Sequence, residues 1–254
     1  MTTNIVKKIQ FVIFALMKNY ILLLSELYSE EQFDLFPELD LRSVHETNCY
    51  CSASSASHIR EQLSDIDTDA VHWIDSGDYH YLSLLFAEKI QGPFHLILFD
   101  NHPDDQASAF EEPGILSCGS WVREALKLPS MVSVVWIGGD RSGVEAPIPD
   151  DGIPVYVSID LDCLSEEYFR TDWNQGNLSP ADITDRLRSI AGSHRIIGID
   201  ICGGLTRAKG ATDAILAGNA SLRKRLSDEL TQLCQTEVQG APDGVPVKML
   251  ADKD

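Results

Sequence analysis

Five short apolar runs, rich in β-branched and aromatic residues, recur along the chain between longer stretches of helical pattern. They occupy residues 70–75, 94–100, 132–140, 155–160 and 195–200. Runs that are apolar at nearly every position are typical of strands covered on both faces, as in a parallel sheet flanked by helices. Candidate crossover helices lie at 78–91, 119–128, 179–191 and about 211–235. This alternation predicts an α/β fold of three αβα layers around a mostly parallel central sheet.

Each of the five runs closes on an aspartate. These residues are Asp75, Asp100, Asp140, Asp160 and Asp200. Because binding sites in open parallel sheets form beyond the carboxyl ends of the strands, we expect one edge of the sheet to be acidic and able to hold a cation. A single strand-end aspartate more often forms a turn or caps a helix, and this interpretation is kept for Asp75 and Asp140.

Two of the runs continue into further acidic or imidazole residues. In "HLILFDNHPDDQ" the residues Asp100, His102 and Asp104 alternate, so in an extended segment they project to one side. The segment "SIDLD" has the same alternation, with Asp160 and Asp162. Carboxylate and imidazole ligands without sulfur suit a hard or borderline divalent ion such as Mn²⁺. So many carboxylates need neutralising charge, which two cations would supply.

Length and composition narrow the function classes. The 254 residues, 44% of them hydrophobic, allow a sizeable core, and we expect one domain over 1–254 with a tail from about 240 that can fray. The net charge of −19 opposes binding to nucleic acid and to anionic membranes. The apolar stretch "IQFVIFALMKNYILLL" is interrupted by Lys18 and Asn19, so we expect a buried helix or strand there. A cytoplasmic protein with reduced cysteines is expected.

The two motifs resemble those of a known family. "DNHPD" at 100–104 is similar to the D-A-H-x-D motif, and "SIDLD" at 158–162 to the S-x-D-x-D motif, of the arginase and agmatinase family, the ureohydrolases. The resemblance covers roughly residues 75–204 and implies a divergent member with an arginase-like α/β fold. It also implies two Mn²⁺ ions at the strand ends and hydrolysis of a non-peptide C–N bond in a small guanidino, amidino or formimino compound. Ureohydrolases often form trimers or hexamers, so a homo-oligomer is one option.

The resemblance also implies a role for each ligand. Asp100 and Asp160 would bridge the two ions; His80 and Asp104 would complete one ion, and His102 and Asp162 the other. His80, in "DSGDYHYLS", stands where the family has the His of a G-G-D-H-S motif, whereas "GGDRS" at 138–142 is closer in letters but comes too late in the chain and carries Arg141. Two adjacent cations lower the pKa of a bridging water, whose hydroxide would attack the carbon. Other divalent ions than Mn²⁺ remain open.

Three departures from the family bear on activity. Gly203 in "GIDICGG" stands where ureohydrolases have a Glu that pairs with the substrate's guanidinium, so arginine itself is not favoured unless Glu166, Glu167 or Asp172 substitutes. Cys118 precedes Gly119 where arginases have a proton-shuttling His; with Asp104 it is the candidate catalytic residue, although a small buried thiol is the ordinary interpretation. Ser165 and Glu166 replace the usual D-P pair after "SIDLD".

These departures leave alternatives open. A non-catalytic, metal-binding or regulatory relative of the enzymes would keep the ligands without hydrolysis. A two-metal phosphoesterase is a third option, which the shortage of Arg and Lys beside the motifs disfavours. His72 and His95, which precede or begin strands, are expected to be structural.

Overall fold

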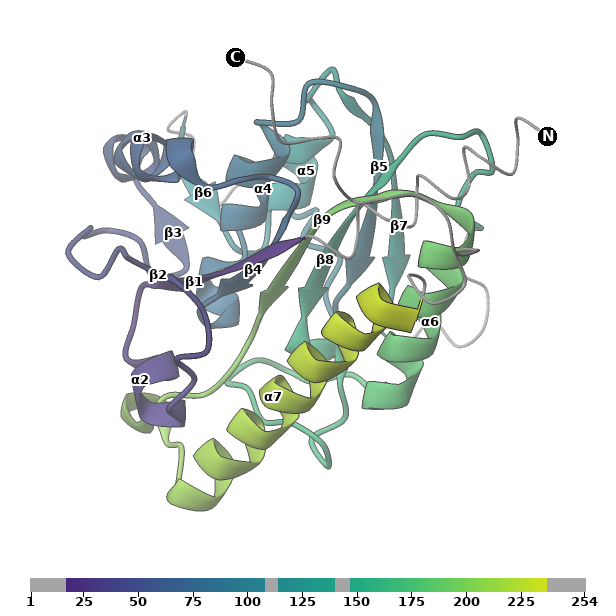
Figure 1. Ribbon diagram of the computed structural model, residues 1–254. Coiled ribbons are helices and arrows are strands. Elements are labelled where there is room, and N and C mark those ends of the chain that lie inside the picture. Colours follow the sequence, from purple (N-terminus) through teal and green to yellow (C-terminus); the bar gives the residue numbers. More distant parts are fainter. Residues whose placement is uncertain (1–16, 108–113, 140–146, 237–254) are drawn as a thin grey trace, which may run out of the picture.

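A seven-stranded sheet forms the middle layer of the protein (Figure 1). The computed structural model describes residues 17–107, 114–139 and 147–236. In these ranges every pair of neighbouring strands is parallel, in the order β2-β1-β4-β9-β8-β5-β7. The strands are β1 (Lys18–Leu23), β2 (Glu38–Asp40), β4 (Ala70–Ile74), β5 (Phe94–Phe99), β7 (Met131–Ile137), β8 (Val155–Asp160) and β9 (Ile196–Cys202). A small antiparallel pair, β3 (Tyr50–Cys51) with β6 (Leu116–Ser117), lies outside the sheet.

Helices cover both faces of the sheet (Figure 1). The long helices α6 (Pro180–Ser193) and α7 (Asp213–Thr236) lie on one face. The other face carries α3 (Ala53–Gln62), α4 (Leu82–Ala87) and α5 (Trp121–Ala125). The remaining elements are α2 (Leu27–Glu31), η1 (Leu63–Asp65), η2 (Gly77–Tyr79), η3 (Leu161–Cys163) and η4 (Arg207–Lys209).

Strand periodicity explains why the runs are apolar throughout. Successive residues of a strand point to opposite faces. In β5, Ile97 and Phe99 therefore pack in the core under α6 and α7, while Leu96 and Leu98 pack in the core under α4 and α5. The predicted three-layer α/β fold with a mostly parallel sheet is confirmed, and within the described residues the sheet is wholly parallel.

The five predicted strands correspond to β4, β5, β7, β8 and β9. The helix predicted at 78–91 is shorter: it starts as the 3₁₀ turn η2, and after α4 tight turns carry the chain to Ile90, whose amide donates to Ala87. The part of the N-terminal apolar stretch that the structure describes is a strand, β1. Asp140, Arg141 and the tail from about 240 lie outside the described residues.

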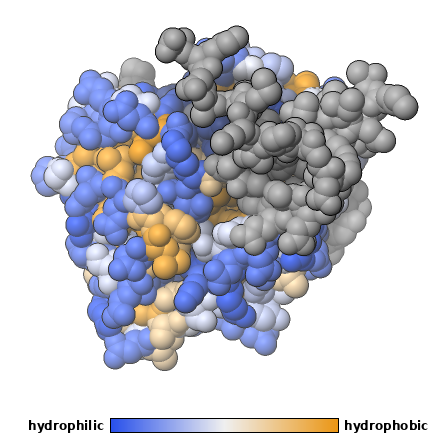
Figure 2. Space-filling view, in the orientation of Figure 1, coloured by the Kyte–Doolittle hydropathy of each residue, from blue (hydrophilic) through white to orange (hydrophobic). Residues whose placement is uncertain are grey.

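Figure 2 shows one face of the molecule, on which apolar patches are separated by hydrophilic residues. In the part of the chain that the structure describes, no helix combines the length and the apolar content that crossing a membrane requires.

Candidate metal centre

The candidate ligands gather at the carboxyl ends of the neighbouring strands β8 and β5. These strands pair in parallel with Phe99 opposite Ile159, so Asp100 and Asp160 leave the sheet side by side. Both are almost fully buried. By strand alternation they continue the row of Leu98 and Ser158, which faces the layer of α4 and α5. The pairing of the strands alone thus brings two carboxylates together.

His80 enters from the turn between η2 and α4. Its Nε2 lies 2.9 Å from Ser158 Oγ, which orients the ring. Its Nδ1 lies 3.0 Å from Asp104 Oδ2, 3.2 Å from Asp100 Oδ2 and 3.7 Å from Asp160 Oδ2. In this arrangement neither His80 Nδ1 nor Asp100 Oδ2 makes a hydrogen bond, although both atoms are buried. Buried polar atoms without a partner are costly, and a shared cation would satisfy both.

A second group lies beside the first and shares Asp100 with it. His102 Nδ1 lies 2.9 Å from Asp162 Oδ2 and 3.5 Å from Asp100 Oδ1. Backbone amides hold the carboxylates: His102 N donates to Asp100 Oδ1 at 2.6 Å, and Asp162 N donates to Asp160 Oδ1 at 2.9 Å. The His102 side chain is 29% exposed, so this group faces the solvent side of the cluster.

Asp104 reaches the cluster by a route that the sequence did not indicate. The expected extended segment would place Asp100, His102 and Asp104 on one side, but Asp104 has a φ of 47°, in the left-handed region. This turn directs its carboxylate back toward His80, and Trp121 Nε1 donates to Asp104 Oδ2 at 2.7 Å. The three side chains do converge, but through a turn rather than through strand alternation.

The electrostatics of the cluster show unbalanced charge. Burial, reinforced by Asp162 and Asp100, raises the pKa of Asp160 to about 8. Burial, reinforced by Asp100, raises the pKa of Asp162 to about 6. Burial alone would lower the pKa of His80, but Cys202, Asp100 and Asp104 outweigh it and raise that pKa well above its usual value. Without metal, protons on these side chains therefore offset the mutual repulsion of the buried carboxylates. The carboxylate and imidazole donors fit two divalent ions in place of those protons.

This titration predicts how pH affects the metal-free protein. The pKa of Asp160 rises from 3.8 to about 8, so its contribution to stability is complete below 3.8 and is lost as pH rises toward 8. Hydrogen bonds to Asp100 and Asp162 raise the pKa of His102 from 6.5 to about 10, so its contribution is complete below 6.5 and is lost toward 10. Both contributions decline with rising pH. Metal binding, which needs deprotonated ligands, tightens over the same range.

We therefore expect the rise in melting temperature on adding Mn²⁺ to grow with pH from about 6 to about 8. Thermal unfolding followed by circular dichroism, in EDTA and in Mn²⁺, would measure the gap between the two curves. A gap that stays constant or narrows with pH would contradict the assignment of these residues as ligands.

Two of the other strand-end aspartates have structural roles. Asp75 accepts hydrogen bonds from the amides of Leu24, Ser25 and Ser76, which agrees with its interpretation as a turn former. For Asp200 the expectation of a strand-end position at the acidic edge was wrong. Strand β9 continues to Cys202, and Asp200 lies inside the sheet, where it accepts from Tyr156 at 2.7 Å.

The two remaining strand histidines also make structural contacts. His72 lies 2.8 Å from Asp200 Oδ1 and 2.8 Å from the Asp67 carbonyl. His95 lies 2.7 Å from Ser133 Oγ and 3.1 Å from Asp151 Oδ2. Both rings are thus occupied away from the ligand cluster, as expected from their places in the sequence.

The position that carries Glu in ureohydrolases has no room for a side chain here. Gly203 has a φ of +104°, and a Cβ on it would lie 2.8 Å from Asp160 Oδ1. The carbonyl of Gly203 accepts a hydrogen bond from the buried Arg223. Of the three proposed substitutes, Glu166 pairs with Arg170 and Glu167 is exposed.

The third substitute, Asp172, lies near the site but is already paired. Lys209 contacts both Asp172 and the buried Asp78. Asp78 in turn accepts from Trp173 Nε1 at 3.2 Å, and the Trp173 ring lies edge-on to His102 with 6.1 Å between ring centroids. Trp173 is 39% exposed and so forms part of the solvent-facing wall. The sequence did not single it out, although a tryptophan in the loop after "SIDLD" was a usable signal.

Replacing Gly203 with alanine should lower stability by more than the strain of its positive φ, because the new Cβ would also displace Asp160. Gly210 has a φ of +106° and open space within 4 Å of the place that a Cβ would take, so it is a matched control for that angle. We expect Gly210→Ala to cost about 1–2 kcal/mol of unfolding free energy, and Gly203→Ala to cost more and to weaken Mn²⁺ binding as well. Urea unfolding and calorimetric titration would measure the two effects. Equal losses in both variants would show that contact with Asp160 is unimportant.

Cys118 lies at the end of the β3–β6 pair and is buried. Burial raises the pKa of its thiol to about 12. Near neutral pH the group therefore keeps its proton, which favours a proton donor or an inert thiol over a nucleophile. Its catalytic role stays a prediction.

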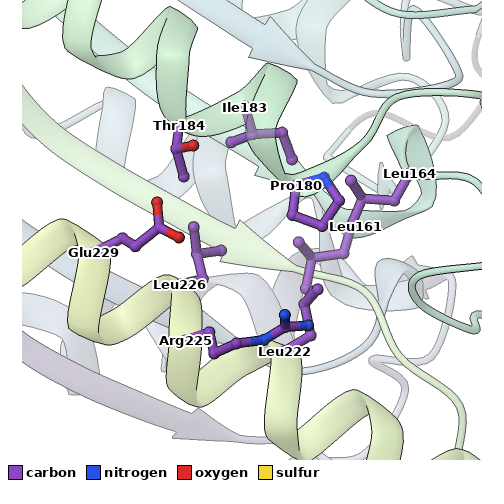
Figure 3. A pocket seen from close by; sticks show the side chains of 9 residues that line it. All are labelled: Leu161, Leu164, Pro180, Ile183, Thr184, Leu222, Arg225, Leu226 and Glu229. Atoms are coloured by element: carbon purple, nitrogen blue, oxygen red, sulfur yellow. The ribbon is translucent and has the colours of Figure 1, made fainter.

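A separate hollow lies between α6 and α7 (Figure 3). Apolar side chains line most of it, with Arg225 and Glu229 on α7 at its rim. None of its lining residues is a candidate ligand, so the hollow is not part of the metal centre.

The chain has the fold of the arginases and agmatinases, that of the ureohydrolases. An arginase from Medicago truncatula superimposes with a TM-score of 0.60 at 14% identity, covering 91% of this chain and 97% of that one. A formimidoylglutamase from Bacillus subtilis gives 0.58 at 14% identity over 89% and 87%. A hypothetical agmatinase from Burkholderia thailandensis gives 0.57 at 19% identity over 90% and 88%.

Sequence comparison reaches less of the chain. A Thermotoga maritima protein described as uncharacterized is 36% identical over 145 residues, 52% of this chain and 57% of that protein. The match thus spans little more than half the length of that relative. No family model matches the sequence. The identities to the solved structures are low, so they support a common fold and leave the chemistry to be argued from the site.

Proposed function

We propose that the protein is a binuclear, manganese-dependent hydrolase that cleaves a non-peptide C–N bond in a small nitrogenous molecule. The observation that carries the proposal is the pair of unpartnered buried atoms, His80 Nδ1 and Asp100 Oδ2, which face each other at 3.2 Å. Both atoms belong to residues of a group in which one cation would contact His80, Asp100 and Asp104. A second cation would contact Asp100, His102 and Asp162. Buried polar atoms without a hydrogen bond are costly, and a cation shared by the two atoms would satisfy both.

The residues of the chain would prepare the reaction by position and charge. When bound, the ion pair would lower the pKa of water to near neutrality and stabilise developing negative charge. Ser158 and Trp121 orient His80 and Asp104 respectively, so these ligands need little reorganisation on binding. In the metal-free protein, burial raises the pKa of the Asp104 carboxyl, and a bound cation would favour its ionised form.

The substrate is proposed to be a guanidino, amidino or formimino compound. The structural neighbours named as arginase, agmatinase and formimidoylglutamase support this class. With Gly203 unable to supply a carboxylate and Asp172 paired to Lys209, a full guanidinium has no free carboxylate among the described residues of this wall. The exposed part of Trp173 can stack on a planar nitrogen group instead, which favours a substrate with a smaller or less basic head than arginine.

The same observation favours a second candidate. A relative that binds the two ions but has lost guanidinium recognition would bind metal without hydrolysis. Such a protein would retain all the candidate metal ligands. It would not need the substrate-binding Glu or the proton-shuttling His that Gly203 and Cys118 replace. Turnover separates the two candidates.

The test is a screen of the Mn²⁺-loaded protein for release of ammonia or urea from guanidino, amidino and formimino compounds. Asp104 and Asp105 offer a matched pair of variants, because Asp104 is buried in the cluster and its neighbour Asp105 is exposed. We expect turnover that Asp104→Asn abolishes and Asp105→Asn preserves. Two ions per chain with no turnover on any compound would overturn the hydrolase and favour the metal-binding relative.

A further inference from the structure

One thiol lies within the ligand cluster itself. Cys202 is the last residue of β9 and is fully buried, with its Sγ 3.2 Å from Asp160 Oδ2. Its place follows from register, because Asp160 and Cys202 are paired residues on the neighbouring strands β8 and β9. Both side chains face the layer of α4 and α5. The thiol therefore lies beside a candidate ligand, the Asp160 carboxylate.

The same thiol is close to a ring nitrogen of His80. Ligand atoms of His80, Asp160 and Cys202 all lie within 4.8 Å of one another. The nitrogen that faces Asp100 and Asp104 is His80 Nδ1, the buried atom without a hydrogen-bond partner. One carboxylate oxygen links the two groups, because Asp160 Oδ2 lies 3.7 Å from His80 Nδ1 and 3.2 Å from Cys202 Sγ.

Cys163 provides the contrast. It is equally buried, but its side chain belongs to the apolar core under α6 and α7, on the opposite side of the sheet from the ligands. Burial alone therefore does not bring a cysteine into the cluster. The position of Cys202 on the ligand side is specific to the end of β9.

We propose that Cys202 is a thiolate ligand of the ion held by His80, Asp100, Asp104 and Asp160. The inference rests on the metal centre proposed above and extends it. On binding, the S–H proton leaves to solvent, the hydrogen bond from Sγ to Asp160 is lost, and a sulfur–metal bond replaces it. A soft ligand in an otherwise oxygen and nitrogen set shifts preference from Mn²⁺ toward Fe²⁺, Co²⁺ and Zn²⁺ at this position. The two ion positions of one centre would then differ in the metal they select.

The test uses Co²⁺ as a spectroscopic probe on the full chain. Metal-stripped protein is loaded with Co²⁺, bound cobalt is measured by elemental analysis, and the near-ultraviolet spectrum is recorded for sulfur-to-cobalt charge transfer. Cys202→Ser removes the sulfur with little change in volume. Cys51→Ser is the matched control, since Cys51 is equally buried and contacts the Ser52 carbonyl rather than a candidate ligand.

We expect the charge-transfer band in the wild type and in Cys51→Ser, and its loss in Cys202→Ser. We also expect Cys202→Ser to lower the ratio of Zn²⁺ to Mn²⁺ affinity by roughly tenfold or more, since even the outer partners of metal ligands are worth 10–100-fold. Bound cobalt without a band in the wild type, or a band that persists in Cys202→Ser, would overturn this proposal alone. Absence of bound cobalt would overturn the metal centre as well. If Cys202→Ser does not fold, the wild-type spectrum decides.

Discussion

Asp160→Asn is expected to remove both ions while leaving the metal-free protein at least as stable as the wild type. Asparagine keeps the size of the side chain and an oxygen that can accept from the Asp162 amide. It removes the charge of a carboxylate that lies 3.7 Å from His80 Nδ1 and whose other oxygen accepts from the Asp162 amide, so bound metal should fall from two ions toward none. Turnover should fall by at least about a thousandfold, because metal ions supply several kcal/mol of transition-state stabilisation.

The stability effect has the opposite sign because the wild-type charge is unfavourable without metal. Burial, Asp162 and Asp100 raise the pKa of Asp160 to about 8, so at about pH 9 the metal-free wild type bears the cost of ionising it. Asp75→Asn is the matched control: this buried carboxylate accepts from three amides and should be destabilised by the change while metal content is unaffected. Metal analysis and urea unfolding in EDTA measure both effects. Retention of two ions by Asp160→Asn would contradict the centre.

Arg223→Met is expected to lower the free energy of unfolding by about 3–5 kcal/mol. Arg223 on α7 is fully buried, pairs with the buried Glu31, and donates to the Gly203 carbonyl. Its guanidinium lies 4.9 Å from the ring centroid of Tyr28 and 5.2 Å from that of Phe169. Methionine fills similar space but leaves Glu31 as a buried carboxylate without its cation, which is the costly state.

Two further variants make this result specific. Replacing both partners, as Glu31→Leu with Arg223→Met, should recover much of the loss, because no uncompensated charge remains. Arg225→Met, on the exposed side of the same helix, should change stability by no more than about 0.5 kcal/mol. Urea unfolding with a constant slope measures all three. If the double variant is as unstable as the single one, the guanidinium acts through packing and its bond to Gly203 rather than through charge.

Much of the architecture could be predicted because local pattern and burial agree in the central strands. Runs such as 94–100 and 155–160 are apolar at nearly every position, since both faces of the sheet are covered. Two candidate ligands could be predicted for a related reason: a polar residue that closes such a run usually lies at the sheet edge. Asp100 and Asp160 are two such residues.

Contacts between residues far apart in the sequence could not be predicted from the local pattern of apolar and polar residues. Asp200 resembles the other strand ends, yet β9 extends two residues further because Cys202 pairs with Asp160. Trp121 donates to the Asp104 side chain from a distant helix, and the contacts of Cys202 and Arg223 join elements that meet only in the folded chain. Short elements such as β2 and α3 have too few apolar residues to stand out against loops. Their positions follow from packing rather than from periodicity.

Gly203 lies between helix α7 and the ligand cluster. A Cβ on it would lie 2.8 Å from Asp160 Oδ1, and its carbonyl accepts a hydrogen bond from Arg223 of α7. Energetic coupling between two sites is reciprocal, so if α7 supports ion binding, ion binding must support α7 to the same extent. Backbone amides of α7 around Arg223 should then exchange their hydrogens more slowly in the loaded protein, and weakening the helix should raise the dissociation constant of the ions. Helix α7 would thus act as a thermodynamic partner of a centre to which its described residues contribute no ligand.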